Sequence, residues 1–288
     1  SKSSHIIALL LPLWYDSTSS MLHDPYTGQL VGCLEELLRE REYYVMLCTF
    51  RNAEQALNIS RRWKVDGMVL VLPHEDDVTR EVVKQTETPL VVMDRHYEDL
   101  PSLSVCLDDF QGGYVATRHV LEMGHRRVGF VCPSLYDSSV IRDRFLGFQK
   151  ALEEFGVKDE PAWHFDQINR MEGGEKLGEI LAGMERRPTA IVTTEDQIAC
   201  GIVKGWQKSG LRVPEDLSVV GFDNSTLSTL ITPALTTVAQ DVHAKAEHAV
   251  NMLMRSIGEE DYRRDLVVLP VSLIRRDTVT GPAEKRVG

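Results

Sequence analysis

The stretch TAIVTTEDQIACGIVKGWQKSGLRVPEDLSVVGFDNS, residues 189–225, predicts two buried strands joined by a helix. Its apolar runs at residues 190–192 and 218–222 are continuous instead of alternating, which is typical of strands in a parallel sheet that is covered on both faces. Between the runs, apolar residues recur at helical spacing from Ile198 to Trp206, and a glycine and then a proline follow. The stretch therefore predicts a strand-helix-strand unit of an open α/β sheet.

Polar side chains follow both predicted strands. Residues 193–196, with the sequence Thr-Thr-Glu-Asp, come after the first strand, and residues 223–225 come after the second. The carboxyl ends of parallel strands meet at one edge of a sheet, and open α/β sheets bind their ligands at that edge. We therefore expect a binding site there.

A longer pattern resembles the effector-binding core of the lactose-repressor (LacI/GalR) family of bacterial transcription regulators. The segment GLRVPEDLSVVGFDN carries most of this likeness. The likeness continues through PLVVMDR at residues 89–95, MGHRRVGFV at residues 123–131 and RFLGFQKAL at residues 144–152, and so covers nearly the whole chain. The resemblance implies the type I periplasmic-binding-protein-like fold.

Strands and helices alternate in two successive rounds along the chain, which predicts an α/β fold with two similar, doubly wound parallel-sheet domains. The resemblance implies that three crossings join the domains in a three-strand hinge, near Asp108, near residues 238–240 and near residues 269–270. The expected domains are residues 1–108 with 240–269, and residues 109–239 with 270–288. A helix-turn-helix DNA-binding domain is expected upstream of His5 and outside this sequence, and the tail beyond Arg275 is expected to be loose.

The composition is that of a globular protein with an acidic surface. Charged residues make up 26% and hydrophobic residues 43% of the sequence, and the formal net charge is -11. Such a charge repels phosphate backbones, so we do not expect this part of the protein to bind DNA directly. The five cysteines never show CxxC spacing, which argues against a zinc site or a disulfide framework and favours the cytoplasm. No run approaches the ~20 apolar residues of a membrane span.

Motifs for metal binding, cofactor binding and catalysis are missing. The sequence has no HExxH, Walker loop, GxGxxG or GxSxG pattern, so neither a metal, a cofactor nor an enzymatic reaction is expected. We interpret His125 as a residue between a helix and a strand. The paired arginines at 61–62, 126–127, 186–187 and 275–276 are scattered among acidic residues and are interpreted as solvated surface.

Three charged residues are the strongest candidates for effector contact. Asp94 and Asp223 each end a predicted strand, and Arg144 lies in the first turns of a predicted helix. Carboxylates and a planar guanidinium can make paired hydrogen bonds to the hydroxyls of a sugar. The resemblance assigns all three residues to the effector. The alternatives are a turn or helix cap for Asp223 and a solvated helix face for Arg144.

Glu195 departs from the family pattern, which commonly has Asn-Asp where this chain has Glu-Asp. A carboxylate only accepts hydrogen bonds, so Glu195 either pairs with Arg144 or selects a ligand with additional donors, such as an amino sugar. The alternative is a solvated carboxylate at a helix N-terminus, where the helix dipole favours a negative charge.

Five further residues are weaker candidates for effector contact. Trp14 and Tyr15 follow the first predicted strand and can stack on a sugar ring or on a base. Gln240 resembles the family's polar contact at the second crossing, and Leu107 and Asn169 complete the expected set.

These observations predict the ligand-sensing core of a LacI-type transcription regulator. A small polar effector, a sugar or sugar derivative, is expected to bind between the domains of a cytoplasmic homodimer and to alter its affinity for operator DNA. The alternative is an exported solute-binding protein of a sugar transporter, since the two-domain fold is shared. An enzyme is the least favoured class, because no nucleophile, base or metal set gathers at the strand ends.

Overall fold

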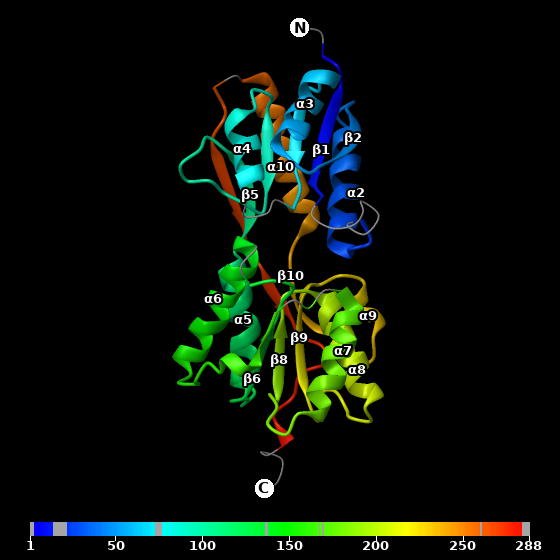
Figure 1. Cartoon of the computed structure of the whole chain (residues 1–288), viewed down its shortest axis with the longest axis vertical. Coiled ribbons are helices and arrows are strands. Elements are labelled where there is room, and N and C mark those ends of the chain that lie inside the picture. Colours follow the sequence, from blue (N-terminus) through cyan, green and yellow to red (C-terminus); the bar gives the residue numbers. More distant parts are fainter. Residues whose placement is uncertain are drawn as a thin grey trace. The chain divides into compact units, whose positions relative to one another are not determined.

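The computed structural model describes residues 3–13, 22–72, 77–135, 138–166, 168, 170–259 and 261–283. The chain divides into two compact units. Unit 1 is Ser1–Leu107 with Asp241–Leu269, and unit 2 is Asp108–Gln240 with Pro270–Gly288. The chain passes from one unit to the other three times, and each unit contains a six-stranded sheet flanked by helices (Figure 1).

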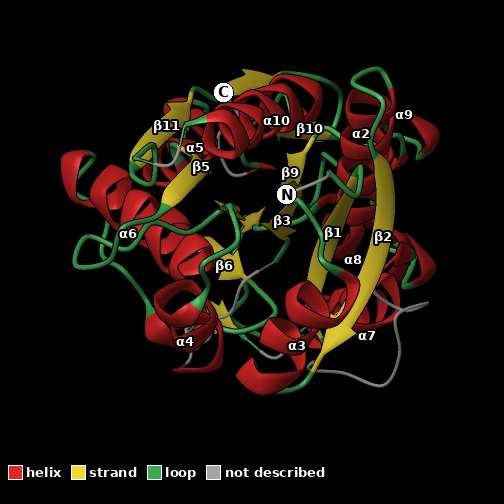
Figure 2. Ribbon diagram, turned by 90° about the horizontal axis from the view of Figure 1, so that it is seen from above, coloured by secondary structure: helices red, strands yellow, loops and turns green. Residues whose placement is uncertain are grey.

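In unit 1 all neighbouring strands of the sheet are parallel. The strands are β1 (Ile6–Pro12), β2 (Tyr44–Phe50), β3 (Gly67–Leu70), β4 (Leu90–Met93), β5 (Leu103–Leu107) and β11 (Asp265–Leu269), in the order β11-β5-β4-β3-β1-β2. The helices are α2 (Pro25–Arg39), α3 (Ala53–Trp63), α4 (Asp77–Gln85) and α10 (Val242–Gly258). Figure 2 shows β1 and β2 running side by side.

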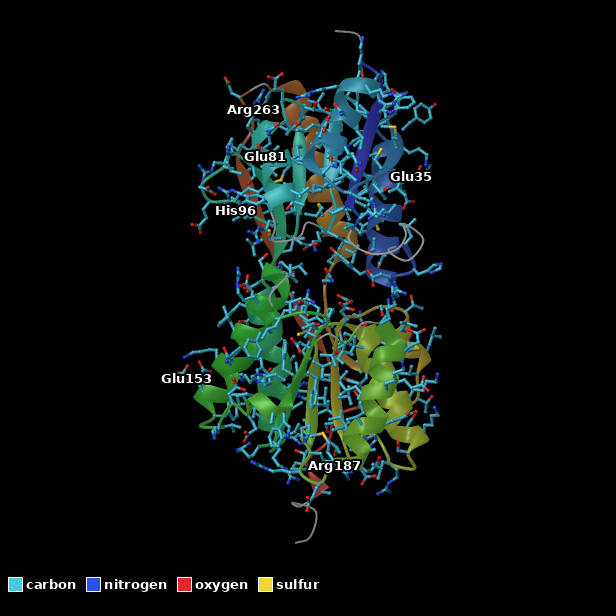
Figure 3. All side chains as sticks on the ribbon, viewed as in Figure 1. Glu35, Glu81, His96, Glu153, Arg187 and Arg263 are labelled. Atoms are coloured by element: carbon cyan, nitrogen blue, oxygen red, sulfur yellow. The ribbon has the colours of Figure 1, made fainter. Side chains whose placement is uncertain are left out.

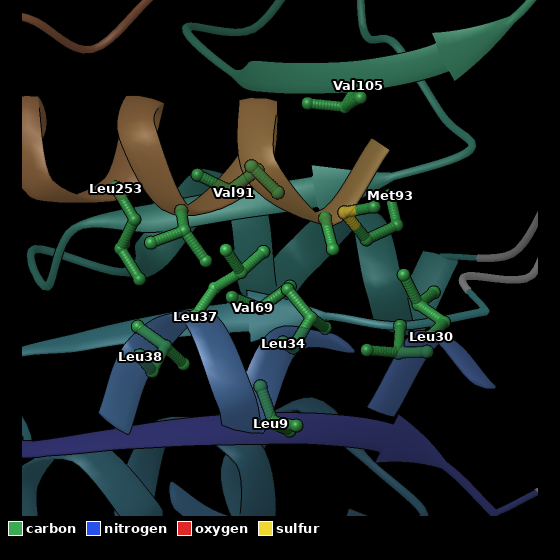
Figure 4. Close-up of a cluster of buried hydrophobic side chains, with 14 of the residues drawn as sticks. Leu9, Leu30, Leu34, Leu37, Leu38, Val69, Val91, Met93, Val105 and Leu253 are labelled. Atoms are coloured by element: carbon green, nitrogen blue, oxygen red, sulfur yellow. The ribbon is translucent and has the colours of Figure 1, made fainter. Parts of the chain in front are cut away.

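Alternate residues of the central strands of unit 1 pack against two separate helical layers. Leu9, Val69 and Val91 belong to the core that β1, β3 and β4 form with α2 and α10 (Figure 4). Their sequence neighbours, such as Leu10 and Met68, pack with residues of α3 and α4. Each large apolar side chain buried in this way contributes about 1.5–3 kcal/mol. Burial on both faces explains why these strands are apolar without alternation.

In unit 2 the strands are parallel except β12, which is antiparallel to β10. They are β6 (Val128–Val131), β7 (His164–Phe165), β8 (Ala190–Thr193), β9 (Ser218–Asp223), β10 (Thr236–Ala239) and β12 (Ser272–Ile274), in the order β12-β10-β9-β8-β6-β7. The helices are α5 (Asp109–Glu122), α6 (Ser139–Glu154), α7 (Arg170–Gly183), α8 (Asp196–Lys208), α9 (Leu227–Leu230) and the 3-10 helix η1 (Pro161–Trp163). The parallel pairing of β8 with β9 confirms the strand-helix-strand prediction for residues 189–225.

Two glycines let α5 and α6 pack backbone to backbone. A Cβ atom at Gly113 would lie 1.9 Å from the carbonyl oxygen of Arg144, and one at Gly147 would lie 2.0 Å from the carbonyl oxygen of Phe110. No side chain fits at such distances, so these positions require glycine. This close approach determines where the first turns of α6 lie.

The tail after Arg275 is ordered as far as Thr280, so the prediction of a loose tail is wrong there. Thr278 is fully buried, and its backbone and hydroxyl both bond to Val219 of β9, at 2.9 and 2.6 Å. His125 lies between α5 and β6, as predicted, and its Nε2 donates to the Thr280 carbonyl oxygen at 2.7 Å. The local composition is typical of a coil, but long-range hydrogen bonds hold the segment in place.

Exposed charged side chains lie on both units. Glu35, Glu153 and Arg263 are exposed, and Figure 3 shows them on the surface. Within the described ranges, no helix has both the length and the apolar character needed to cross a membrane.

Candidate functional site

The carboxyl edge of the unit 1 sheet carries Asp94, the residue that follows β4. Its φ angle of 59° lies in the left-handed region. Its carboxylate forms an ion pair with the ammonium group of Lys245 and accepts a hydrogen bond from the Tyr26 hydroxyl at 2.8 Å. The Lys245 ammonium also donates to the Tyr26 hydroxyl oxygen, at 2.7 Å. Asp94 is thus held as a negatively charged acceptor, and its side chain remains 12% exposed.

Lys245 is a residue of the candidate site that the sequence analysis missed. Its side chain is 1% exposed, although lysine is almost never fully buried unless it is paired. The signal was present in the periodicity of α10, because position 245 falls on the same helix face as Ala249 and Val242. A cation on an apolar stripe indicates a buried partner, and here that partner is Asp94.

Three of the candidate residues lie outside the described part of the chain, namely Trp14, Tyr15 and Asn169. Leu107 is described: it ends β5 and is 5% exposed.

The carboxyl edge of the unit 2 sheet brings together Asp223 and Gln240. Asp223 is the last residue of β9, and Gln240 follows β10, the neighbouring strand. The Gln240 side-chain amide donates to the Asp223 carboxylate at 2.7 Å. Asp223 and the next residue, Asn224, both have positive φ angles, of 108° and 52°. The site side chain therefore sits on a turn with an unfavourable backbone conformation.

Arg144 is buried in unit 2, so the alternative of a solvated helix face is wrong. Its side chain is 7% exposed, and Nε donates to the Asp109 carboxylate at 2.8 Å. A terminal guanidinium nitrogen donates to the Thr194 carbonyl oxygen at 2.7 Å, and the guanidinium carbon lies 3.4 Å from the centre of the Phe222 ring. These contacts hold the guanidinium group over the ring of Phe222, the residue that precedes Asp223 in β9.

Glu195 is the N-cap residue of α8 and is half-buried. Its side chain makes no capping hydrogen bond, while its carbonyl oxygen accepts from the Thr193 hydroxyl at 3.0 Å. The pKa of the buried Cys132 thiol is raised to about 12, first by burial and then by the negative charges of Asp166 and Glu195. The negative charges of both carboxylates therefore reach Cys132, the residue that follows β6.

Asp196 forms a buried network that the sequence analysis did not single out. The residue is 1% exposed. One carboxylate oxygen accepts from the backbone and the hydroxyl of Ser225, at 2.7 and 2.9 Å. The other accepts from the Thr237 hydroxyl at 2.6 Å. The network joins the start of α8 to β10 and to the turn after β9.

Arg276 also contributes to this region, which corrects its interpretation as solvated surface. Its guanidinium donates to the Asn224 side chain at 2.6 Å, to the Ser228 hydroxyl at 3.0 Å and to the Leu235 carbonyl oxygen at 2.9 Å. The ordered C-terminal segment thus places a cation beside the turn after β9. Among the described residues, no group of three or more histidine, cysteine, aspartate or glutamate side chains is arranged to hold a metal ion.

Residues 117–279 match the family described as periplasmic binding protein-like domain. The HTH-type transcriptional repressor PurR of Mannheimia succiniciproducens is 30% identical over 261 residues, which cover 88% of this chain and 78% of that protein. The chain belongs to the LacI family of transcription regulators. Its fold is that of the effector-binding core of these regulators, and the proteins that it resembles are named as regulators, not as enzymes.

Solved structures of LacI-family regulators share the fold. A LacI-type transcriptional regulator from Bacillus cereus subsp. cytotoxis has a TM-score of 0.87 at 22% identity, with 96% of this chain and 98% of that chain covered. A LacI-family regulator from Enterococcus faecium, solved with bound ribose, has a TM-score of 0.80 at 24% identity, with the same coverage of 96% and 98%. The predictions of the family and of the two-domain, type I periplasmic-binding-protein-like fold are confirmed.

Proposed function

We propose that this chain binds a small polar effector, a sugar or sugar derivative, between its two units and thereby alters the operator affinity of a dimer. The observation that carries the proposal is that each unit holds a fixed carboxylate at the carboxyl edge of its sheet, Asp94 in unit 1 and Asp223 in unit 2. Open α/β sheets bind ligands at that edge. The ribose in the Enterococcus faecium regulator supports a carbohydrate as the ligand class.

Each site residue has a separate task in this proposal. Asp94 and Asp223 accept hydrogen bonds from effector hydroxyls, and the preorganised guanidinium of Arg144 donates to an effector oxygen. Gln240 orients Asp223, and Leu107 supplies an apolar surface. Trp14, Tyr15 and Asn169 complete the contacts, the aromatic residues by stacking on a ring face.

Glu195 distinguishes among sugars. As a half-buried acceptor at the N-terminus of α8, it favours an effector that carries additional donors, such as the ammonium group of an amino sugar. Replacement by glutamine keeps the shape and adds a donor. We expect Glu195→Gln to weaken D-glucosamine binding and to leave ribose binding nearly unchanged.

Regulation then rests on differential affinity and requires no chemical step. An effector that binds one arrangement of the two units more tightly shifts the population towards that arrangement. A shift from 1:99 to 99:1 requires about 5.5 kcal/mol of differential binding. Operator DNA is contacted through a helix-turn-helix domain joined to this core, and a homodimer presents two such domains to a symmetric operator. The relatives named as repressors favour this function over that of a solute-binding protein.

A thermal-shift screen tests the proposal. The panel contains ribose, cellobiose, sucrose, D-glucosamine, polyols and nucleosides. A ligand at about 100 times its Kd stabilises the protein by about 2.7 kcal/mol, which raises the Tm by about 5 °C for a protein of this size. We expect a hit to be lost in Asp94→Asn and in Asp223→Asn, and kept in the control Asp216→Asn, whose carboxylate is partly exposed and accepts a hydrogen bond from the nearby Arg212 backbone. A shift that survives both site substitutions would place the ligand elsewhere and overturn the assignment.

A further inference from the structure

The turn after β9 has a backbone conformation that needs external support. Asp223 and Asn224 both have φ angles in the left-handed region, at 108° and 52°. Residues other than glycine rarely adopt this conformation, and it persists only where surrounding contacts impose it. The last residue of the strand could otherwise relax and turn its carboxylate away.

The contacts that impose this conformation converge on Asp196. The Ser225 backbone N–H donates directly to the Asp196 carboxylate at 2.7 Å. The Asn224 N–H donates at 3.3 Å to the hydroxyl oxygen of Thr237, which in turn donates to the same carboxylate at 2.6 Å. Both amides that follow Asp223 are therefore held by one buried side chain, one of them directly and the other through Thr237.

We propose that Asp196 is a positioning residue of the effector site, which acts through Ser225 and Thr237 to hold Asp223 in the orientation that the effector requires. This inference rests on the proposed function, because it concerns the same site. Asp196 does not itself touch the effector, since it is 1% exposed. It links Glu195, its neighbour at the start of α8, to Asp223 at the end of β9.

The surroundings of Asp196 are closed. A Cβ atom at Gly221 of β9 would lie 2.3 Å from the Asp196 carboxylate, so only glycine leaves room for the carboxyl group. Neutral donors fill the acceptor positions, and Arg276 of the C-terminal segment is the cation that stabilises the charge from a greater distance. Cys200 on α8 responds to this negative charge: burial and then Asp196 raise the pKa of its thiol to about 12.

Burial makes the support sensitive to pH. It raises the pKa of Asp196 from 3.8 to about 6, while the hydrogen bonds from Thr237 and Ser225 and the charge of Arg276 act in the opposite direction. A protonated carboxyl accepts fewer hydrogen bonds, so the bonds from Ser225 and Thr237 that hold the turn weaken as the pH falls through about 6. If the effector binds only when Asp196 is ionised, its affinity drops about tenfold at one pH unit below that pKa.

Amide hydrogen exchange tests the positioning role without any ligand. At about pH 7.5, we expect Asp196→Ala to lower the protection factors of the Asn224 and Ser225 amides about tenfold or more, and to leave the amides of β6 unchanged. Asp196→Asn retains an acceptor oxygen, so it restores part of the protection and removes its dependence on pH. Asp216→Asn serves as the control. The proposal would be overturned if the Asn224 and Ser225 amides of Asp196→Ala kept their wild-type protection factors. It would also be overturned if all amides of unit 2 lost protection equally.

Calorimetric titration with D-ribose and with D-glucosamine gives the second measurement. We expect the wild-type affinity for the binding sugar to fall about tenfold between about pH 7 and about pH 5, and that of Asp196→Asn to remain level. A wild-type affinity that stays level over this range would contradict the coupling to Asp196. If neither sugar binds any of the proteins, the proposed effector class fails for these probes, while the exchange experiment still decides the role of Asp196.

Discussion

The two units hold their site carboxylates by different means, although both place them at the same edge of a parallel sheet. In unit 1, Asp94 is paired with a full positive charge, the buried ammonium of Lys245. In unit 2, Asp223 accepts a hydrogen bond from the neutral side-chain amide of Gln240. The turn that follows Asp223 is held by a second, buried carboxylate, that of Asp196. The fold thus determines where each carboxylate lies, while the residues next to it determine which groups hold it in place. In unit 1 a cation bonds the carboxylate directly, whereas in unit 2 a neutral amide bonds it and a buried carboxylate holds the turn that follows it.

Loss of the cation in unit 1 is expected to have the largest effect. Lys245→Met leaves Asp94 with a largely buried negative charge and no ammonium beside it, which destabilises the protein by about 3–5 kcal/mol. Urea unfolding measures the change, and amide exchange assigns it to unit 1. The double variant Asp94→Asn with Lys245→Met should recover part of the loss.

A matched exposed lysine provides the control for this prediction. Lys204 pairs with Glu175 at 2.6 Å, but its side chain is 61% exposed. Lys204→Met is therefore expected to change the free energy of unfolding by less than about 1 kcal/mol. Equal effects of the two lysine substitutions would remove the contrast between a buried and a solvated pair.

The buried carboxyl group of Asp196 in unit 2 is expected to make stability depend on pH. Burial raises the pKa of Asp196 from 3.8 to about 6. Its contribution to stability is therefore fully present below pH 3.8 and is lost as the pH rises through about 6. Relative to Asp196→Asn, the wild type should lose on the order of 3 kcal/mol of unfolding free energy across this window. Urea unfolding of both proteins at several pH values gives the difference, and a difference independent of pH would show that Asp196 titrates normally.

The close packing of α5 and α6 is expected to have an intermediate effect. Gly147→Ala forces a Cβ atom against the Phe110 carbonyl oxygen, now only 2.0 Å from that position, and should destabilise unit 2 by about 1–3 kcal/mol. It also displaces Arg144 and lowers effector affinity. Gly183 in α7 has no atom within 4 Å of its Cβ position. Gly183 is the last residue of α7, where alanine is favoured less than in mid-helix, so Gly183→Ala should stabilise the protein by at most about 0.5 kcal/mol, and thermal unfolding should move the two variants in opposite directions.

Removal of the neutral donor in unit 2 is expected to have the smallest effect. Gln240→Ala deletes one hydrogen bond to Asp223 and should lower the free energy of unfolding by about 0.5–1.5 kcal/mol. Gln207 on the exposed surface of α8 donates a comparable hydrogen bond to the Thr232 carbonyl oxygen at 2.9 Å, and Gln207→Ala removes it. In calorimetric titration with a sugar that binds the wild type, only Gln240→Ala should weaken binding. Equal affinities of these two variants would show that Gln240 does not orient Asp223.

Local sequence was enough to predict the sheet edge at which much of the candidate site lies, because periodicity and strand ends are local properties. The continuous apolar runs predicted the parallel strands β8 and β9, and the residues that follow them predicted the edge at which Glu195 and Asp223 lie. Lys245 was accessible in principle, since its position on the apolar face of α10 is a periodic signal. The roles of Asp196 and Arg276 were not accessible in this way, because their partners lie far away in the chain.

The sequence by itself determined the fold class and the strand ends that carry polar groups, because these follow from short-range patterns of apolar and polar residues, and it indicated the family through the resemblance of its motifs. Only the tertiary structure decided which groups pair. Lys245 meets Asp94 across 151 positions, and the Thr278 hydroxyl closes on β9 across 59. Arg144 is a buried partner of Asp109 and does not lie on a solvated helix face. Such contacts form because buried charges and backbone groups must find partners, and the folded chain alone brings those partners within reach.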